Sequence, residues 1–159
     1  MAWYEPITVP NCTAFSPDGR TIYWADSPTR RILTADLDPA TGAAERIPGQ
    51  GEARYASTRW VSGRGMMTIS DQGSDWVRLC ALDPATGVVT PVFAPEGREV
   101  EAYSYSPDGK WLATIENDRG YAVLRVGGAD DAERRQPPNS KPGHTFRDGS
   151  RRRCNARRC

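Results

Sequence analysis

The sequence contains few side chains whose types and spacing suit catalysis. Acidic groups stand at the ends of predicted strands, where they are usually solvated, and none has a visible partner for acid–base catalysis. These groups are Asp26, Glu52, Asp71, Glu101 and Asp118. No G-x-S-x-G motif is present, and the single histidine, His144, lies in a polar stretch near the C-terminus. The sequence therefore predicts no complete active site and no catalytic residue.

The cysteines do not form a metal-binding pattern either. Cys154 and Cys159, with His144 at a distance, offer at most three ligands and lack the spacing of a zinc site. The first residues have neither the basic start nor the apolar stretch of a signal peptide, and no run of about 18 apolar residues occurs. We therefore expect a cytoplasmic protein with free thiols and no contact with a membrane.

Charge divides the chain into two parts. Residues 1–127 carry 12 Lys/Arg against 16 Asp/Glu, and residues 128–159 carry 9 against 4. After Val126 the only large apolar side chain is that of Phe146, so residues 128–159 are predicted to form a disordered basic tail. The tail lacks interleaved aromatic residues, and we expect no nucleic-acid partner. We also hypothesise that it is a frame-shifted end.

An internal repeat of about 45 residues organises the rest of the chain. The hexapeptide Leu-Asp-Pro-Ala-Thr-Gly begins at Leu37 and again at Leu82. The tetrapeptide Ser-Pro-Asp-Gly begins at Ser16 and again at Ser106, two periods later. A degenerate copy, in which Pro and Asp are lost, follows Trp60. Pro, Asp and Gly at these positions are typical of hairpin turns, and we interpret both motifs as architectural.

The repeats contain the pattern of short strands joined by these turns, four in each of the first two repeats and three in the last. Four strands in about 40 to 50 residues is the length of one propeller blade. The sequence thus predicts an all-β fold, a partial β-propeller of about three four-stranded antiparallel blades. The predicted blades lie near residues 9–50, 51–97 and 98–127.

Three blades are fewer than the usual minimum of about four for a closed ring. Either a second chain completes the ring or the chain is part of a longer protein, and we favour the longer protein. An open stack leaves unpaired strand edges, from which we expect self-association or marginal stability.

Residues 49–127 resemble the N-terminal propeller of the prolyl oligopeptidase family, in particular its acylaminoacyl- and dipeptidyl-peptidase-like members. The resemblance rests on Gly51–Trp60, Ser70–Leu79, Val100–Gly109 and Ile115–Arg125. It implies a propeller that covers a separate α/β-hydrolase domain and admits short peptides to its active site. No hydrolase domain is visible in this sequence.

Residues 9–44 resemble the gluconolactonase/regucalcin (senescence marker protein) family, whose propellers hydrolyse sugar lactones with one divalent metal. The stretch Pro10–Pro28, followed by Arg31–Ile32 and Asp36–Gly42, carries this resemblance. It implies that Asn11 is a metal ligand, and an amide oxygen among carboxylates suits calcium. The family's other ligands, a Glu, an Asn and an Asp, are not found in this chain.

From these resemblances we expect a non-catalytic propeller fragment of the peptidase-gating type, with no cofactor. The alternative is a fragment of a metal-dependent sugar lactonase, with calcium at Asn11; a second alternative is a propeller-type interaction scaffold. A splice of two related propellers near residue 48 would explain the change of resemblance.

Overall fold

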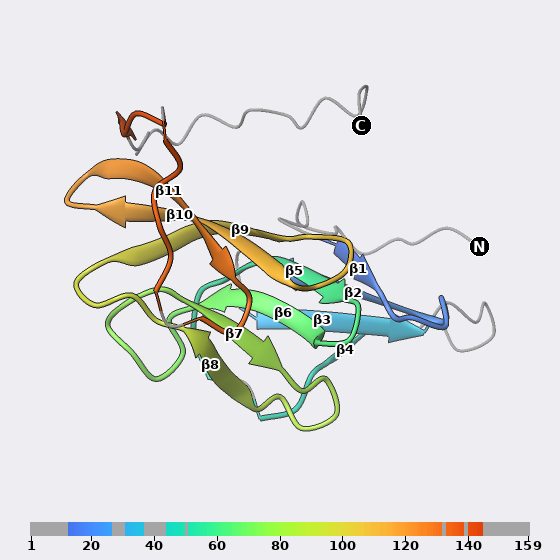
Figure 1. Ribbon diagram of the computed structural model, residues 1–159. Helices are drawn as coiled ribbons and strands as arrows, with labels where there is room; N and C mark the ends of the chain where they lie inside the picture. Colours follow the sequence, from blue (N-terminus) through green and yellow to red (C-terminus); the bar gives the residue numbers. More distant parts are fainter. Residues whose placement is uncertain are drawn as a thin grey trace.

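The computed structural model describes residues 13–26, 31–36, 44–49, 51–131, 133–138 and 140–144. Within these ranges the secondary structure consists of short strands joined by turns (Figure 1). None of the described residues belongs to a helix that is long and apolar enough to cross a bilayer.

In the described residues, twelve strands form three separate four-stranded sheets. The first sheet contains β1 (Thr13–Phe15), β2 (Thr21–Asp26), β3 (Arg31–Asp36) and β4 (Ala44–Arg46). The second contains β5 (Tyr55–Val61), β6 (Gly65–Ser70), β7 (Arg78–Leu82) and β8 (Val89–Phe93). The third contains β9 (Glu99–Tyr105), β10 (Trp111–Asp118), β11 (Tyr121–Gly128) and β12 (Gly143–His144). All neighbouring strands are antiparallel and follow chain order, which confirms the prediction of three propeller blades.

The repeated tetrapeptide forms the same hairpin turn in the first and third sheets. Gly109 takes a φ of 69° and its N–H donates to the Ser106 carbonyl at 2.9 Å. The Asp108 carboxylate accepts from the Ser106 hydroxyl at 2.6 Å and from the Lys110 N–H at 3.2 Å. Gly19 and Asp18 repeat this arrangement around Ser16. Ser, Asp and Gly of the motif are all used within the turn, as expected for an architectural motif.

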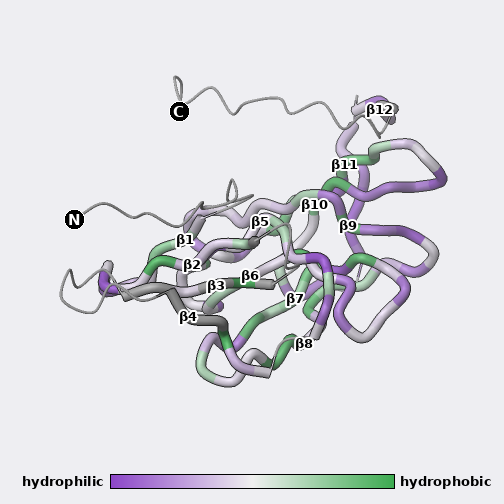
Figure 2. The backbone as a smooth tube through the Cα atoms, turned by 180° about the vertical axis from the view of Figure 1, so that it is seen from behind, coloured by the Kyte–Doolittle hydropathy of each residue, from purple (hydrophilic) through white to green (hydrophobic). Residues whose placement is uncertain are grey.

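The core lies between the faces of successive sheets. One buried cluster joins the first and second sheets and includes Tyr23, Ile32 and Met66; another joins the second and third sheets and includes Ile69 and Leu112. Hydrophobic stretches of the chain follow strands such as β7 and β8, whereas most connecting loops are hydrophilic (Figure 2). Each sheet therefore buries one face against its neighbour, as propeller blades do.

A bulge in β5 shapes the contact between the second and third sheets. The pairing of β5 with β6 shifts between Ala56 and Arg59, and Ser57 adopts a φ of 53°. The Tyr103 hydroxyl donates to the Ser57 carbonyl at 2.7 Å and lies 2.9 Å from the Met67 carbonyl. One buried phenol thus links β9 to two strands of the neighbouring sheet.

The segment that follows Val126 differs from the expectation of disorder in its described part, residues 128–131, 133–138 and 140–144. Val126 and Arg135 form a bridge with backbone hydrogen bonds of 2.8 and 2.9 Å, and β12 pairs with β11. Arg134 is only 7% exposed, and its guanidinium lies 3.8 Å from the centroid of the Phe93 ring. The aliphatic part of the Arg134 side chain and its cation–π contact thus take the place of the aliphatic residues that usually anchor a segment to the core. Residues 145–159 lie outside the described part of the chain.

Candidate functional site

The first strands of the three sheets define two ends of the stack. β1 contacts β5, and β5 contacts β9. We call the end at which these strands begin the entry end. Because neighbouring strands are antiparallel, the turns from β6 to β7 and from β10 to β11 lie at the same end (Figure 1). The repeated hairpin turns lie at the opposite end.

Polar side chains at the entry end are held by local hydrogen bonds. The Asn117 amide donates to Glu101 Oε1 at 3.1 Å, and its own oxygen accepts from the Gly120 N–H at 2.8 Å. Asp71 Oδ1 accepts from the Arg54 N–H at 2.6 Å. Glu101, Asn117 and Asp71 are all half-buried. These groups present fixed oxygen acceptors, the atoms that bind sugar hydroxyls and hard cations.

A buried charge lies beneath this surface, between the second and third sheets. Glu116 is fully buried, and its Oε2 lies 3.0 Å from Arg98 Nε and 3.2 Å from Arg125 Nε. Neither contact has hydrogen-bond geometry, so both are ion pairs. Glu116 Oε1 accepts a hydrogen bond from the Thr114 hydroxyl at 2.8 Å, and Arg125 also reaches Asp118 at 3.7 Å. The cluster neutralises itself and its central carboxylate, Glu116, is inaccessible, which favours a structural role.

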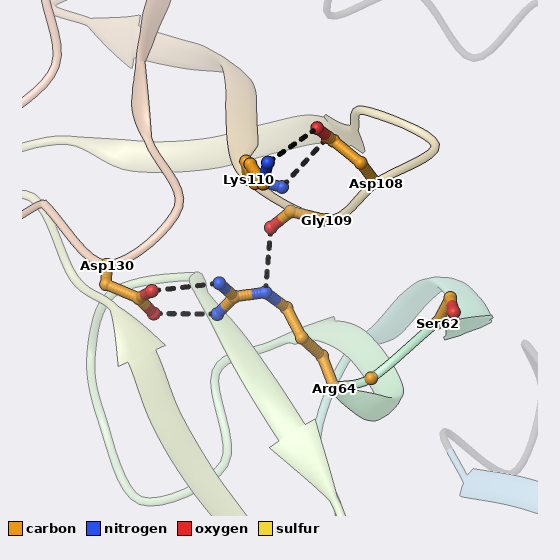
Figure 3. Close-up of a pocket in the computed structure, with 7 residues that line it drawn as sticks. Ser62, Arg64, Asp108, Gly109, Lys110 and Asp130 are labelled. Carbon is orange, nitrogen blue, oxygen red and sulfur yellow. Dashed lines mark hydrogen bonds and ion pairs between the residues drawn. The ribbon is translucent and has the colours of Figure 1, made fainter.

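A polar hollow of about 420 Å³ lies at the opposite end, between the hairpin turns of the second and third sheets (Figure 3). The Arg64 guanidinium binds both oxygens of Asp130, at 2.8 and 3.0 Å, and donates to the Gly109 carbonyl at 3.1 Å. These contacts lower the pKa of Asp130 below its ordinary value and raise that of Arg64. Because Arg64 is already satisfied by protein groups, the hollow offers little to a ligand.

The structure does not assemble a metal site from the described residues. Asn11, the one ligand implied by resemblance, lies outside them, as does the side chain of Asp26. Glu52 is exposed, while Glu101 and Asp71 belong to different sheets and have partners of their own. The described residues alone do not provide a donor set for a divalent cation, so we derive no metal-dependent step.

The prediction that Glu101 is a solvated acid overlooks its place in the repeat. Glu101 precedes Ser106 by five residues, as Asn11 precedes Ser16, so the two are equivalent positions two periods apart. Glu116 is absent from the predicted site residues, although the alternation of Leu112, Thr114 and Glu116 along one strand indicates that its side chain points inward.

Comparison with known proteins first defines the class and then the family. Residues 2–130 match the model of the SMP-30/gluconolactonase/LRE-like region. A "putative sugar lactone lactonase" of Rhizobium meliloti (strain 1021) is 30% identical over 146 residues, covering 90% of this chain and 46% of that protein. The protein is therefore a β-propeller chain that belongs to the SMP-30/gluconolactonase/LRE-like family. It spans about half the length of this curated relative.

Solved structures confirm the propeller fold. A puromycin hydrolase superposes with a TM-score of 0.65 at 21% identity, covering 82% of this chain and 22% of that one. TolB from Acinetobacter baumannii gives 0.62 at 18% identity, covering 79% and 31%. Regucalcin, a calcium-binding protein from Agrobacterium tumefaciens, gives 0.53 at 17% identity, covering 82% and 43%. At these identities the likeness concerns the fold.

These comparisons change the balance between the sequence-based interpretations. The peptidase-gating interpretation is supported by the fold alone, whereas the lactonase alternative is supported by family membership and by a relative. The family match and the alignment with the lactonase relative both span residue 48, which counts against the hypothesis of a splice there.

Proposed function

We propose that this chain forms about half of the ring of a sugar lactone hydrolase and that its entry end faces the substrate. The observation that carries the proposal is the single family match over residues 2–130, strengthened by the sugar lactone lactonase relative. The carboxylates and amides at the entry end agree with it, because a sugar lactone is a neutral molecule rich in hydroxyl groups that need acceptors.

Within this proposal Glu101 binds substrate or an oxygen-liganded cation. Its carboxylate is half-buried, is oriented by the Asn117 amide, and stands at the repeat position of Asn11. Calcium is the proposed cofactor, with Asn11 as its ligand in the first repeat, since amide and carboxylate oxygens suit this ion. One such ligand does not hold a metal, so the remaining ligands must come from further blades.

Hydrolysis of a sugar lactone, followed as acid release with calcium, manganese or zinc present, tests the function. We expect metal-stimulated hydrolysis by the protein once its ring is complete, whether by self-assembly or within a longer protein. Glu101→Gln should lower kcat/KM at least about tenfold, because it removes one charge from the site. Glu96→Gln, which alters an exposed carboxylate after β8, should leave it unchanged.

Two results would contradict the proposal. One is a complete ring that releases no acid from any sugar lactone with any of the three metals. The other is hydrolysis that Glu101→Gln and Glu96→Gln affect equally, which would remove Glu101 from the site while leaving the activity in place.

A further inference from the structure

The outer face of the third sheet, which points away from the second sheet, carries apolar side chains like those of a buried face but is exposed. Ile69 and Leu79 stand opposite each other on β6 and β7 and are both 0% exposed, because the third sheet packs on them. Ile115 and Leu124 stand opposite each other at the equivalent places on β10 and β11, and both are 38% exposed. A position that is buried in one blade and open in the next indicates a missing neighbour.

The first sheet likewise has exposed apolar side chains on its outer face, which points away from the second sheet, at positions where the second sheet has buried ones. Phe15 and Ile22 are register partners on β1 and β2, where the second sheet has Trp60 and Met66. Met66 is 1% exposed, and the Trp60 ring packs edge-on against Tyr23 with a centroid distance of 6.3 Å. In contrast, Phe15 is 55% exposed and Ile22 is half-buried, although Trp24, two residues along β2 on the same face, is only 8% exposed.

The two open faces are therefore complementary in kind. The face with Phe15 is equivalent to the face of the second sheet that packs against the first sheet. The face with Ile115 is equivalent to the face of the second sheet against which the third sheet packs. Among the described residues, strand pairing does not run from one sheet to the next, so the stack ends in these two faces, in addition to the strand edges from which self-association was expected. Adjacent exposed apolar side chains on such a face mark an interaction surface.

We propose that a second copy of this chain covers both faces, head to tail, and closes a six-bladed ring. Phe15 of each copy would then lie on the Ile115–Leu124 face of the other, as Trp60 lies on Tyr23. One chain spans 46% of the lactonase relative, so two copies approach the length of one complete chain of that type. A head-to-tail contact that closes after two copies leaves neither face open.

This proposal does not depend on the proposed function, because it concerns only blade packing. Analytical ultracentrifugation over a wide range of concentrations tests it without substrate or metal. We expect a dimer of fixed size. A chain that stays monomeric would overturn the proposal and leave further blades from a longer protein as the cover. Larger rings or filaments would also overturn it.

Three variants establish which faces meet. Leu124→Asp and Phe15→Asp should each weaken the dimer by about thirtyfold or more, since each places a charge in an apolar contact. Val88→Asp, at an apolar residue that is 58% exposed just before β8, is the matched control and should leave the dimer intact. All three positions are exposed in the single chain, so folding, checked by circular dichroism, should be unaffected.

Mixing the variants distinguishes head-to-tail from face-to-like-face pairing. In a head-to-tail ring, one Phe15→Asp chain and one Leu124→Asp chain share one unaltered contact, so the mixture should dimerise more tightly than either variant alone. If like faces paired, one of the two variants alone would dimerise normally, and the proposal would fail.

Discussion

The carboxylate of Glu116 lies 3.0 Å from Arg98 Nε, which joins β10 to the segment that enters β9. Glu116 is fully buried, while the Arg98 side chain is 29% exposed. Next to this pair, the Val100 N–H donates to the Val77 carbonyl of the second sheet at 2.9 Å. The charged pair thus fixes the segment that enters the third sheet, and the backbone bond holds that sheet against the second at the entry end.

Glu116→Gln should therefore destabilise the protein by about 3 kcal/mol. The amide keeps the shape and can still accept from the Thr114 hydroxyl, but it leaves Arg98 without its counter-charge and leaves Arg125 with Asp118 alone. Urea unfolding measures the loss, and Glu96→Gln at an exposed site provides the control. Equal unfolding midpoints for the two variants would contradict this, and would mean that water solvates the arginines as well as Glu116 does.

Gly49 lies in the connection between the first two sheets, against the turn that joins β7 to β8. It has a φ of 72°, and a Cβ atom added there would lie 2.4 Å from the Thr86 carbonyl oxygen. Gly49→Ala should cost about 3 kcal/mol or more, from backbone strain and the clash together.

Gly73→Ala separates these two causes. Gly73 has a φ of 68° and nothing within 4 Å of the added atom, so only backbone strain of about 1 kcal/mol is expected. Urea midpoints that fall equally in both variants would mean that the Thr86 turn moves away freely.

Arg134 anchors the chain segment that follows β11. Its side chain covers Phe93, and its Nη2 group donates to the Ala129 carbonyl at 3.4 Å. Arg134→Ala should cost about 1–3 kcal/mol and speed hydrogen exchange at the Arg135 N–H, which binds the Val126 carbonyl at 2.9 Å. Arg135→Ala, at an exposed neighbouring side chain, should change the unfolding midpoint little. Equal unfolding midpoints for Arg134→Ala and Arg135→Ala would show that Arg134 does not anchor this segment.

The repeat made the blades predictable because it repeats turn chemistry. Pro17, Asp18 and Gly19 are determined by local hydrogen bonds and backbone dihedral angles, which are properties of a few adjacent residues. Arg134 was not predictable in this way. Its burial depends on Phe93, 41 residues away, and composition alone assigned the whole segment to a disordered tail.

The candidate site was predictable only in part for a similar reason. Strand ends located the acidic groups, but the partner of Glu101 is Asn117 on the neighbouring strand, and the charge partners of Glu116 come from two different segments. Single-sequence patterns do not reveal such pairings across a sheet. Asn11, chosen by resemblance, remains a prediction.

The buried thiol of Cys80 should make stability depend on alkaline pH. Cys80 is 0% exposed, and burial raises the pKa of its thiol from 9.0 to about 11. Between these values the folded chain keeps a proton that the unfolded chain has lost, so the free energy of unfolding falls as pH rises from about 9 to about 11. The loss contributed by this thiol should reach about 2 kcal/mol.

Urea unfolding at several pH values between about 8 and 11, in the natural chain and in Cys80→Ala, isolates this contribution. Tyr23 and Tyr105, whose pKa values burial also raises, affect both proteins equally. The stability difference between the two proteins should therefore shrink as pH rises. A difference that stays constant would mean that the thiolate forms in the folded chain as readily as in the unfolded one, and that β7 opens to solvent around Cys80.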